Sequence, residues 1–278
     1  MTLLRALVRR KPLGALGGAI VLLMLLIAIF ADRLAPHHFN ETSLLHALQK
    51  PGPAYWFGTD ELGRDVFSRV IYGARVSMFI GLGATLIAVL VASALGIASG
   101  YYGRSVDLAI QRVVDAWMAF PGLVMVLIIL ALLGPGALNV VLALGISQAF
   151  AQSRIIRSAT LVVREQLFIE ASLAAGARHP RVLLRHVLPN VMAPIIVLAS
   201  NLLGFVILVE AAVSFLGYGV PPPQPSWGGM LSATGRTYMM RAPWLSIFPG
   251  LALSLAVFGF NILGDALRDL LDPRLKDG

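Results

Sequence analysis

The chain has 278 residues, of which 58% are hydrophobic and only 13% are charged. A soluble domain of this length needs far more polar surface, so the composition indicates a polytopic membrane protein. The net charge of +8 does not indicate nucleic-acid binding, because no basic helix with interleaved aromatic residues lies outside the apolar windows. The absence of cysteine excludes disulfides and thiolate metal sites.

Charge-free windows predict an all-α membrane protein with six transmembrane helices. At about 1.5 Å per residue, the first window is long enough to cross a bilayer core. A later window, from Ala116 to Ser153, is too long for one crossing, and the turn residues Gly134–Gly136 divide it into two spans. The predicted spans are residues 13–31, 76–100, 113–133, 137–158, 190–212 and 243–265.

The first window has a rival interpretation as a cleaved signal peptide, because the basic stretch RRKP precedes it. The apolar run is longer than the roughly 7–15 residues usual in such peptides, and no clear small-x-small cleavage site follows. We therefore expect an uncleaved first span within an N-terminal unit of residues 1–75. A core with five further spans would occupy residues 76–266, and a tail would occupy residues 267–278.

The basic residues predict the orientation. With the N-terminus inside, most of the 22 lysines and arginines fall in inner segments, which favours both termini in the cytoplasm. The segment over residues 164–189 is then an inner loop between the fourth and fifth spans. The uncharged residues 217–229 are expected to form a structured outer loop, because their prolines would interrupt a helix.

The inner loop over residues 164–189 predicts a helix–break–helix elbow. Residues that favour helices precede Gly176, and Pro180 disfavours helical geometry at His179. A second short helix is expected to start there and to end at Pro189, which opens the next span. The small residues at Ala174–Ala177 would let a partner's backbone approach closely. From the residues alone, an ordinary polar loop that follows the positive-inside rule remains the alternative.

The elbow resembles the signature loop of ATP-binding-cassette importer permeases, which reads Glu-Ala-Ala, three residues, Gly, nine residues, Ile-x-Leu-Pro. Here Glu170, Ala171, Gly176 and the segment 186–189 match it, while Ser172 and His186 depart from it. The variant RHVLPN is similar to the dipeptide, oligopeptide and nickel branch of these permeases. Segments 57–77, 210–231 and 242–275 resemble that branch too, although Tyr218 and Pro221 differ from its usual residues.

The resemblance implies a type I ABC importer permease fold in the inner (plasma) membrane of a bacterium or archaeon. It also implies a sister permease as heterodimer partner, two ABC ATPase subunits that hold ATP and Mg, and a periplasmic or lipid-anchored solute-binding protein. The implied cargo is di- or oligopeptides, with nickel or another small solute as the alternative. The implied ATPase-docking residues are Glu170, Ala171, Ala174, Ala175, Gly176, Ala177, Arg178 and Pro180.

The chain lacks the residues of a motor or an enzyme. A phosphate-binding loop needs Gly-Lys followed by Ser or Thr, and none of the three lysines, Lys11, Lys50 and Lys276, follows a glycine. We expect no catalytic residue, cofactor or metal in this chain. His37, His38 and His46 could suit nickel, but no carboxylate or cysteine cluster completes a site around them.

Polar residues within the spans are candidates for lining a translocation path, because ionisable and amide groups are costly in lipid. Asn201 and Gln148 lie deep in their spans, and Glu210 lies near the outer end of the fifth. The alternatives are a buried acid satisfied by a neighbouring helix and amides that bond helices together.

At the ends of spans, Asp60, Arg64, Asp65 and Arg69 are expected to pair along a surface helix. Asp265, Arg268 and Asp269 are expected to pair similarly or to contact the ATPase.

Two other functions remain open at this point. A secondary transporter driven by an ion gradient usually needs carboxylates at mid-membrane depth, and the centres of the predicted spans lack Asp and Glu. An intramembrane hydrolase would need a serine or aspartate with a partner at matching depth, yet no histidine lies in a span core.

Overall fold

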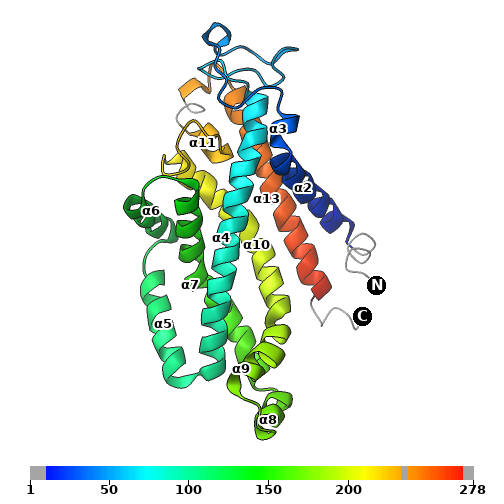
Figure 1. The fold of residues 1–278 in the computed structure, drawn as a ribbon, viewed down its shortest axis with the longest axis vertical. Helices are drawn as coiled ribbons and strands as arrows, with labels where there is room; N and C mark the ends of the chain where they lie inside the picture. Colours follow the sequence, from blue (N-terminus) through cyan, green and yellow to red (C-terminus); the bar gives the residue numbers. More distant parts are fainter. Residues whose placement is uncertain (1–10, 233–236, 272–278) are drawn as a thin grey trace.

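The structure is a computed structural model that describes residues 11–232 and 237–271, and these residues form helices and loops with no β-strand. Among these residues, six long helices run roughly along the longest axis of the molecule (Figure 1). They are α2 (Pro12–Ile29), α4 (Val66–Tyr102), α5 (Arg104–Met118), α7 (Ala137–Arg164), α10 (Leu188–Phe215) and α13 (Trp244–Leu271). The shorter helix α6 (Gly122–Leu133) lies across this direction (Figure 1).

Short elements gather at the two ends of this bundle (Figure 1). The elbow end carries α8 (Leu167–Ala174), α9 (His179–Val182) and a π-helical turn, η2 (Leu183–Val187). The opposite end, here called the loop end, carries the segment 35–65 with the 3-10 turn η1 (Leu44–His46), and also α11 (Trp227–Leu231). The helix α3 (Ala31–Leu34) follows α2 directly.

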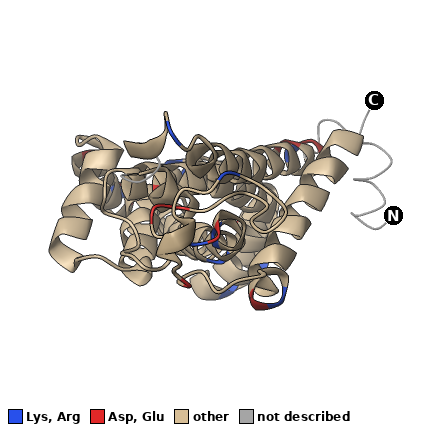
Figure 2. Ribbon diagram, turned by 90° about the horizontal axis from the view of Figure 1, so that it is seen from above, with Lys and Arg blue, Asp and Glu red and all other residues tan. Residues whose placement is uncertain are grey.

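Among the described residues, four helical stretches are long and apolar enough to cross a bilayer: α2, α4, the continuous stretch His179–Phe215, and α13. The pair α5 and α6 makes a fifth candidate only if both helices count as one bent span. The helix α7 is not among these candidates, since Asn139, Gln148 and Gln152 interrupt its apolar residues. The charged residues are sparse along the whole ribbon (Figure 2), as expected for a multi-pass membrane protein.

The helix expected over residues 113–133 is broken in the structure. α5 ends at Met118, α6 begins at Gly122, and the two helices meet at 88°. The cause is Pro121, which lacks an N–H and disfavours helical geometry at Phe120.

A second difference from the sequence prediction is the start of α4, which begins at Val66 rather than at residue 76. The Asp65 carboxylate accepts the Ser68 N–H at 2.9 Å and caps the helix there.

The charged residues before α4 do not lie along one surface helix, contrary to the sequence prediction. Asp60 and Arg64 pair at 2.6 Å within a turn that precedes α4, and Gly63 in that turn has φ +72°. Arg69, in the first turns of α4, reaches the same Asp60 carboxylate at 3.5 Å and donates to the Phe39 carbonyl at 3.0 Å. This buried cluster folds the segment 35–65 onto the start of α4.

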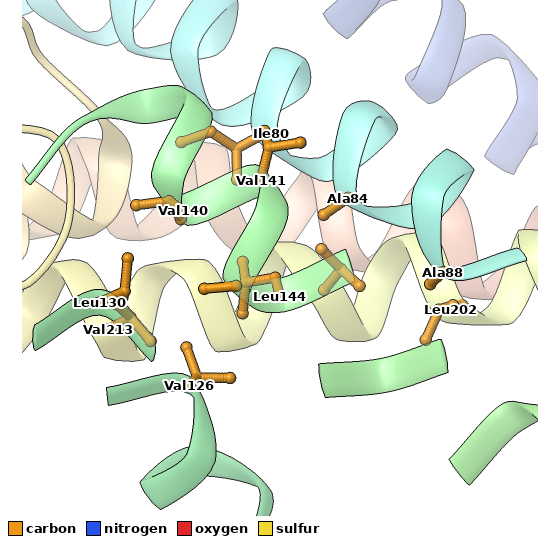
Figure 3. Packing of buried hydrophobic residues seen from close by; sticks show 12 residues of the cluster. Ile80, Ala84, Ala88, Val126, Leu130, Val140, Val141, Leu144, Leu202 and Val213 are labelled. Atoms are coloured by element: carbon orange, nitrogen blue, oxygen red, sulfur yellow. The ribbon is translucent and has the colours of Figure 1, made fainter. Parts of the chain in front are cut away.

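The core lies between α4 and α7, with α6 and α10 packed against it. Figure 3 shows Ile80 and Ala84 of α4 facing Val141 and Leu144 of α7. Further along the same pair, a Cβ added to Gly96 would stand 2.6 Å from the Ser153 carbonyl oxygen. The two longest helices of the core therefore approach each other at backbone distance, as small residues allow in membrane bundles.

Candidate functional site: an elbow and a cleft

The first limb of the elbow, α8, ends in a Schellman motif. The Gly176 N–H donates to the Leu173 carbonyl at 2.9 Å, and the Ala177 N–H donates to the Ser172 carbonyl at 3.0 Å. This pairing requires a left-handed residue after the helix, and Gly176 supplies it with φ +81°. The chain reverses here because glycine adopts this conformation without a steric penalty.

The second limb does not stop at Pro189, which corrects the sequence prediction. α9, η2 and α10 form one continuous helical stretch from His179 to Phe215. The Leu188 N–H bonds to the Leu183 carbonyl five residues back, which is a π-type hydrogen bond. Pro189 therefore sits in the first turn of α10, and the Asn190 side chain donates to the His186 carbonyl at 2.7 Å. A motion of the elbow would thus act directly on α10.

The elbow is fixed to the helices above it. The Tyr101 hydroxyl, at the end of α4, lies 2.8 Å from Nδ1 of His179. Ile169 of α8 is only 2% exposed and packs in one apolar cluster with Ile156 of α7 and Val187 of η2. These contacts make the elbow a folded, positioned element rather than a loose polar loop.

The tip of the elbow is open to solvent or to a partner. Of the eight residues expected to dock, seven are exposed and Ala177 is half-buried. A Cβ added to Gly176 would meet nothing within 4 Å. Two apolar side chains of the elbow, Leu167 at the start of α8 and Leu184 of η2, are 81% and 66% exposed. An exposed patch of this kind indicates a protein contact or a membrane contact.

A cleft of about 680 Å³ opens between α7, α10 and the end of α13. Two of the three predicted path residues, Gln148 and Asn201, line it, and Gln152 joins Gln148 one helical turn along α7. The cleft walls are otherwise mainly apolar, from Val197 to Phe205 of α10. Sequence reasoning missed the involvement of Arg268, which also lines the cleft.

Glu210, the third predicted path residue, lies elsewhere and does not line the cleft. It is fully buried and accepts hydrogen bonds from Ser214 at 2.7 Å and Ser77 at 3.3 Å. The Ser77 hydroxyl in turn accepts the Trp227 N–H at 3.3 Å. This arrangement matches the alternative interpretation of a buried acid that neighbouring helices satisfy.

The histidines of the segment 35–65 have ordinary partners. His46 Nδ1 lies 3.0 Å from the Ser43 hydroxyl, and His37 lies 3.5 Å from the Glu41 carboxylate. Within residues 11–232 and 237–271, no group of three His, Asp, Glu or Cys side chains converges on a possible metal position.

The described ends of the chain lie together. Lys11, just before α2, forms a salt bridge of 2.6 Å with Asp269 near the end of α13. The start of α2 and the end of α13 both point toward the elbow end (Figure 1). Asp269 thus pairs with Lys11 across the bundle, a partner outside the group Asp265, Arg268 and Asp269 in which the sequence pattern predicted pairing.

Comparison with known proteins identifies the family. Residues 92–277 match the family model of the binding-protein-dependent transport system inner membrane component, and residues 6–51 match the N-terminal transmembrane domain of oligopeptide transport permease C. The chain therefore belongs to the binding-protein-dependent transport permeases, in the dipeptide and oligopeptide branch of the ABC importers. It is the transmembrane component of a transport complex, not an enzyme.

Named relatives cover nearly the whole chain. The dipeptide transport system permease protein DppC of Alkalihalophilus pseudofirmus is 42% identical over 96% of this chain and 88% of its own length. The glutathione transport system permease protein GsiD of Pectobacterium atrosepticum is 40% identical over 96% of this chain and 89% of its own length. A putative peptide transport permease of Brucella suis is 41% identical over 98% of this chain and 91% of its own length.

A solved structure shows the same fold. A chain of the MetNI methionine ABC transporter, in inward-facing conformations, superposes with a TM-score of 0.58 at 15% sequence identity. The match covers 74% of this chain and 97% of the other. The chain therefore has the type I ABC importer permease fold.

Proposed function

We propose that the chain is one of two sister permeases in an ATP-driven importer of di- or oligopeptides in a bacterial or archaeal inner membrane. A solute-binding protein delivers the cargo to the loop end, and two ABC ATPases that hold ATP and Mg bind at the elbow end. The elbow end and both termini then face the cytoplasm, and six crossings complete the membrane domain. The names of the relatives support the cargo class, since they are dipeptide, peptide and glutathione permeases.

The observation that carries the proposal is the construction of the elbow. Its tip is exposed and nearly bare of side chains, whereas its base is buried against Ile156 and bonded to Tyr101. Its second limb runs without a break into α10, which forms one wall of the cleft. A push by a partner on the tip would therefore tilt a helix that lines the cleft. ATP changes the conformation only if it binds the closed ATPase arrangement more tightly than the open one.

Gly176→Asp tests the docking assignment. The substitution adds a charged side chain to the tip and imposes a side chain at φ +81°, so we expect ATPase subunits to co-purify poorly and peptide uptake to fall at least tenfold in proteoliposomes. Gly217→Asp is the matched control, because Gly217 also has a left-handed φ, +89°, with no atom within 4 Å of an added Cβ, but lies after α10 at the loop end. The control should retain the ATPases.

Normal ATPase binding and transport by Gly176→Asp would refute the docking assignment. Uptake that needs a proton gradient but no ATP would instead favour a secondary transporter. Uptake of Ni²⁺ in place of peptides would keep the permease assignment and change the cargo.

A further inference from the structure

Arg268 lies at the elbow-side end of the cleft, one helical turn beyond Asn201. Gly264 and Arg268 are four residues apart and share one face of α13. A Cβ added to Gly264 would overlap the Asn201 side-chain oxygen, so α13 and α10 touch at that point. The Arg268 guanidinium therefore follows directly on the amide of Asn201 along the cleft wall.

The charge of Arg268 is not neutralised within the described part of the chain. No hydrogen bond or ion pair joins it to residues 11–232 or 237–271. Its neighbour Asp269 is already paired with Lys11 at 2.6 Å. Arg268 is the one charged residue among the described residues that line the cleft. The cleft consequently has a positive end near the elbow, and no acidic side chain is among its described lining residues.

Three amides lie along the rest of the cleft. Gln148 and Gln152 of α7 and Asn201 of α10 make no hydrogen bond with the described residues, so their donors and acceptors are available to a ligand. Polar groups in a membrane-spanning helix are costly unless they meet water or a partner. A cation at one end, amides along the walls and apolar side chains between them fit an extended ligand with one carboxylate and internal amide groups.

We propose that Arg268 binds the C-terminal carboxylate of the peptide cargo as the cargo leaves toward the elbow end, while the three amides hydrogen-bond its peptide groups. The guanidinium presents two parallel N–H donors that match the geometry of a carboxylate. The identity of the ligand as a peptide rests on the proposed function, but the anion preference of the cleft does not.

The anion preference is tested on the purified importer complex in detergent, where both ends of the cleft are accessible. The chain has no native cysteine, so Asn201→Cys gives a single thiol in the cleft. We would measure the rate at which this thiol is modified by two reagents. One is the anionic sulfonatoethyl methanethiosulfonate, and the other is the cationic trimethylammonioethyl methanethiosulfonate. Adding Arg268→Gln should lower the ratio of the anionic to the cationic rate about threefold to tenfold, since a nearby unit charge is removed.

Two matched variants make this result specific. Arg268→Lys keeps the positive charge and should keep the ratio. Arg112→Gln removes the charge of an exposed arginine on α5, away from the cleft, and should leave the ratio unchanged. The proposal is overturned if Arg268→Gln leaves the ratio as it was, or if the thiol at position 201 reacts with neither reagent.

The carboxylate assignment is tested by transport. Proteoliposomes with the complete importer and saturating solute-binding protein receive alanyl-alanine or its C-terminal amide. Arg268→Gln should reduce uptake of the free acid about tenfold and leave uptake of the amide nearly unchanged. The binding protein can prefer one of the two peptides over the other. This preference cancels when the uptake of each peptide by the variant is divided by its uptake by the wild type, because the same binding protein is used with both.

An equal fractional loss of both peptides would overturn the carboxylate contact. So would protection of the thiol at position 201 by phosphatidylglycerol but not by alanyl-alanine, which would assign the anion site to a lipid headgroup. If the wild type imported no peptide, the proposed function would fail, whereas the labelling ratio would still report on the anion site.

Discussion

Glu210 shows how one buried side chain can connect three elements. Its carboxylate lies on α10, accepts from Ser77 of α4, and through that hydroxyl reaches the backbone of Trp227 in α11. Ser214 donates to the other carboxylate oxygen. A buried carboxylate with satisfied oxygens holds its neighbours at fixed separation, whereas the same group without partners would be strongly destabilising. We therefore assign Glu210 a structural role at the loop end.

Glu210→Ala should lower the free energy of unfolding by about 2–4 kcal/mol, because it removes both acceptors and leaves a cavity. Glu210→Gln keeps one acceptor oxygen and nearly the same volume, so it should cost about half as much. Thermal unfolding of the two variants in detergent measures the difference. Identical, wild-type-like melting of both variants would contradict the structural role.

Toward the elbow, the contact between α4 and α7 depends on glycine rather than on large apolar side chains. Gly96 approaches the Ser153 carbonyl, and Gly100 approaches the side chain of Thr160, where an added Cβ would stand 2.7 Å from the threonine Cβ. Small residues at this spacing allow two helices to pack at backbone distance. The fold of the elbow depends on this contact, since the ends of both helices carry its base.

Gly96→Ala should therefore destabilise the protein by about 1–3 kcal/mol, because the added methyl group meets backbone atoms that cannot move independently. Gly122→Ala is the control, since a Cβ there meets nothing within 4 Å and alanine is the better helix former. It should be neutral or slightly stabilising. Comparable melting temperatures for the two variants would show that the helices are not in tight contact at Gly96.

Local backbone chemistry was predictable where one residue decides the conformation. The break after α8 follows from Gly176, because the left-handed turn there needs no contact from elsewhere in the chain. The same reasoning was wrong at Pro189, where a π-type hydrogen bond lets the helix continue through the proline. The expected single span over residues 113–133 was wrong as well, because Pro121 divides it into two helices at 88°.

The molecule as a whole has two distinct ends, and the cleft between α7, α10 and α13 lies toward the elbow end. The loop end is built from the charged cluster of Asp60, Arg64 and Arg69, and the elbow end from α8 and α9 (Figure 1). Sequence reasoning proposed Gln148, Asn201 and Glu210 for one path, whereas the structure places Gln148 and Asn201 in one cleft with Arg268 and buries Glu210 elsewhere. Which helix faces meet is decided by packing between residues that are distant in the chain, and hydropathy carries little of that information.

The most direct test of the account is the reactivity of single cysteines toward a membrane-impermeant maleimide in inside-out vesicles that hold the complete importer. Ala175→Cys, at the exposed elbow tip, should react slowly while the ATPases are bound and at least tenfold faster once they are stripped off. Leu45→Cys, at the loop end and 96% exposed, should be unreactive from this side in both states. Equal rates at Ala175→Cys with and without ATPases, or labelling of Leu45→Cys from this side, would contradict the account.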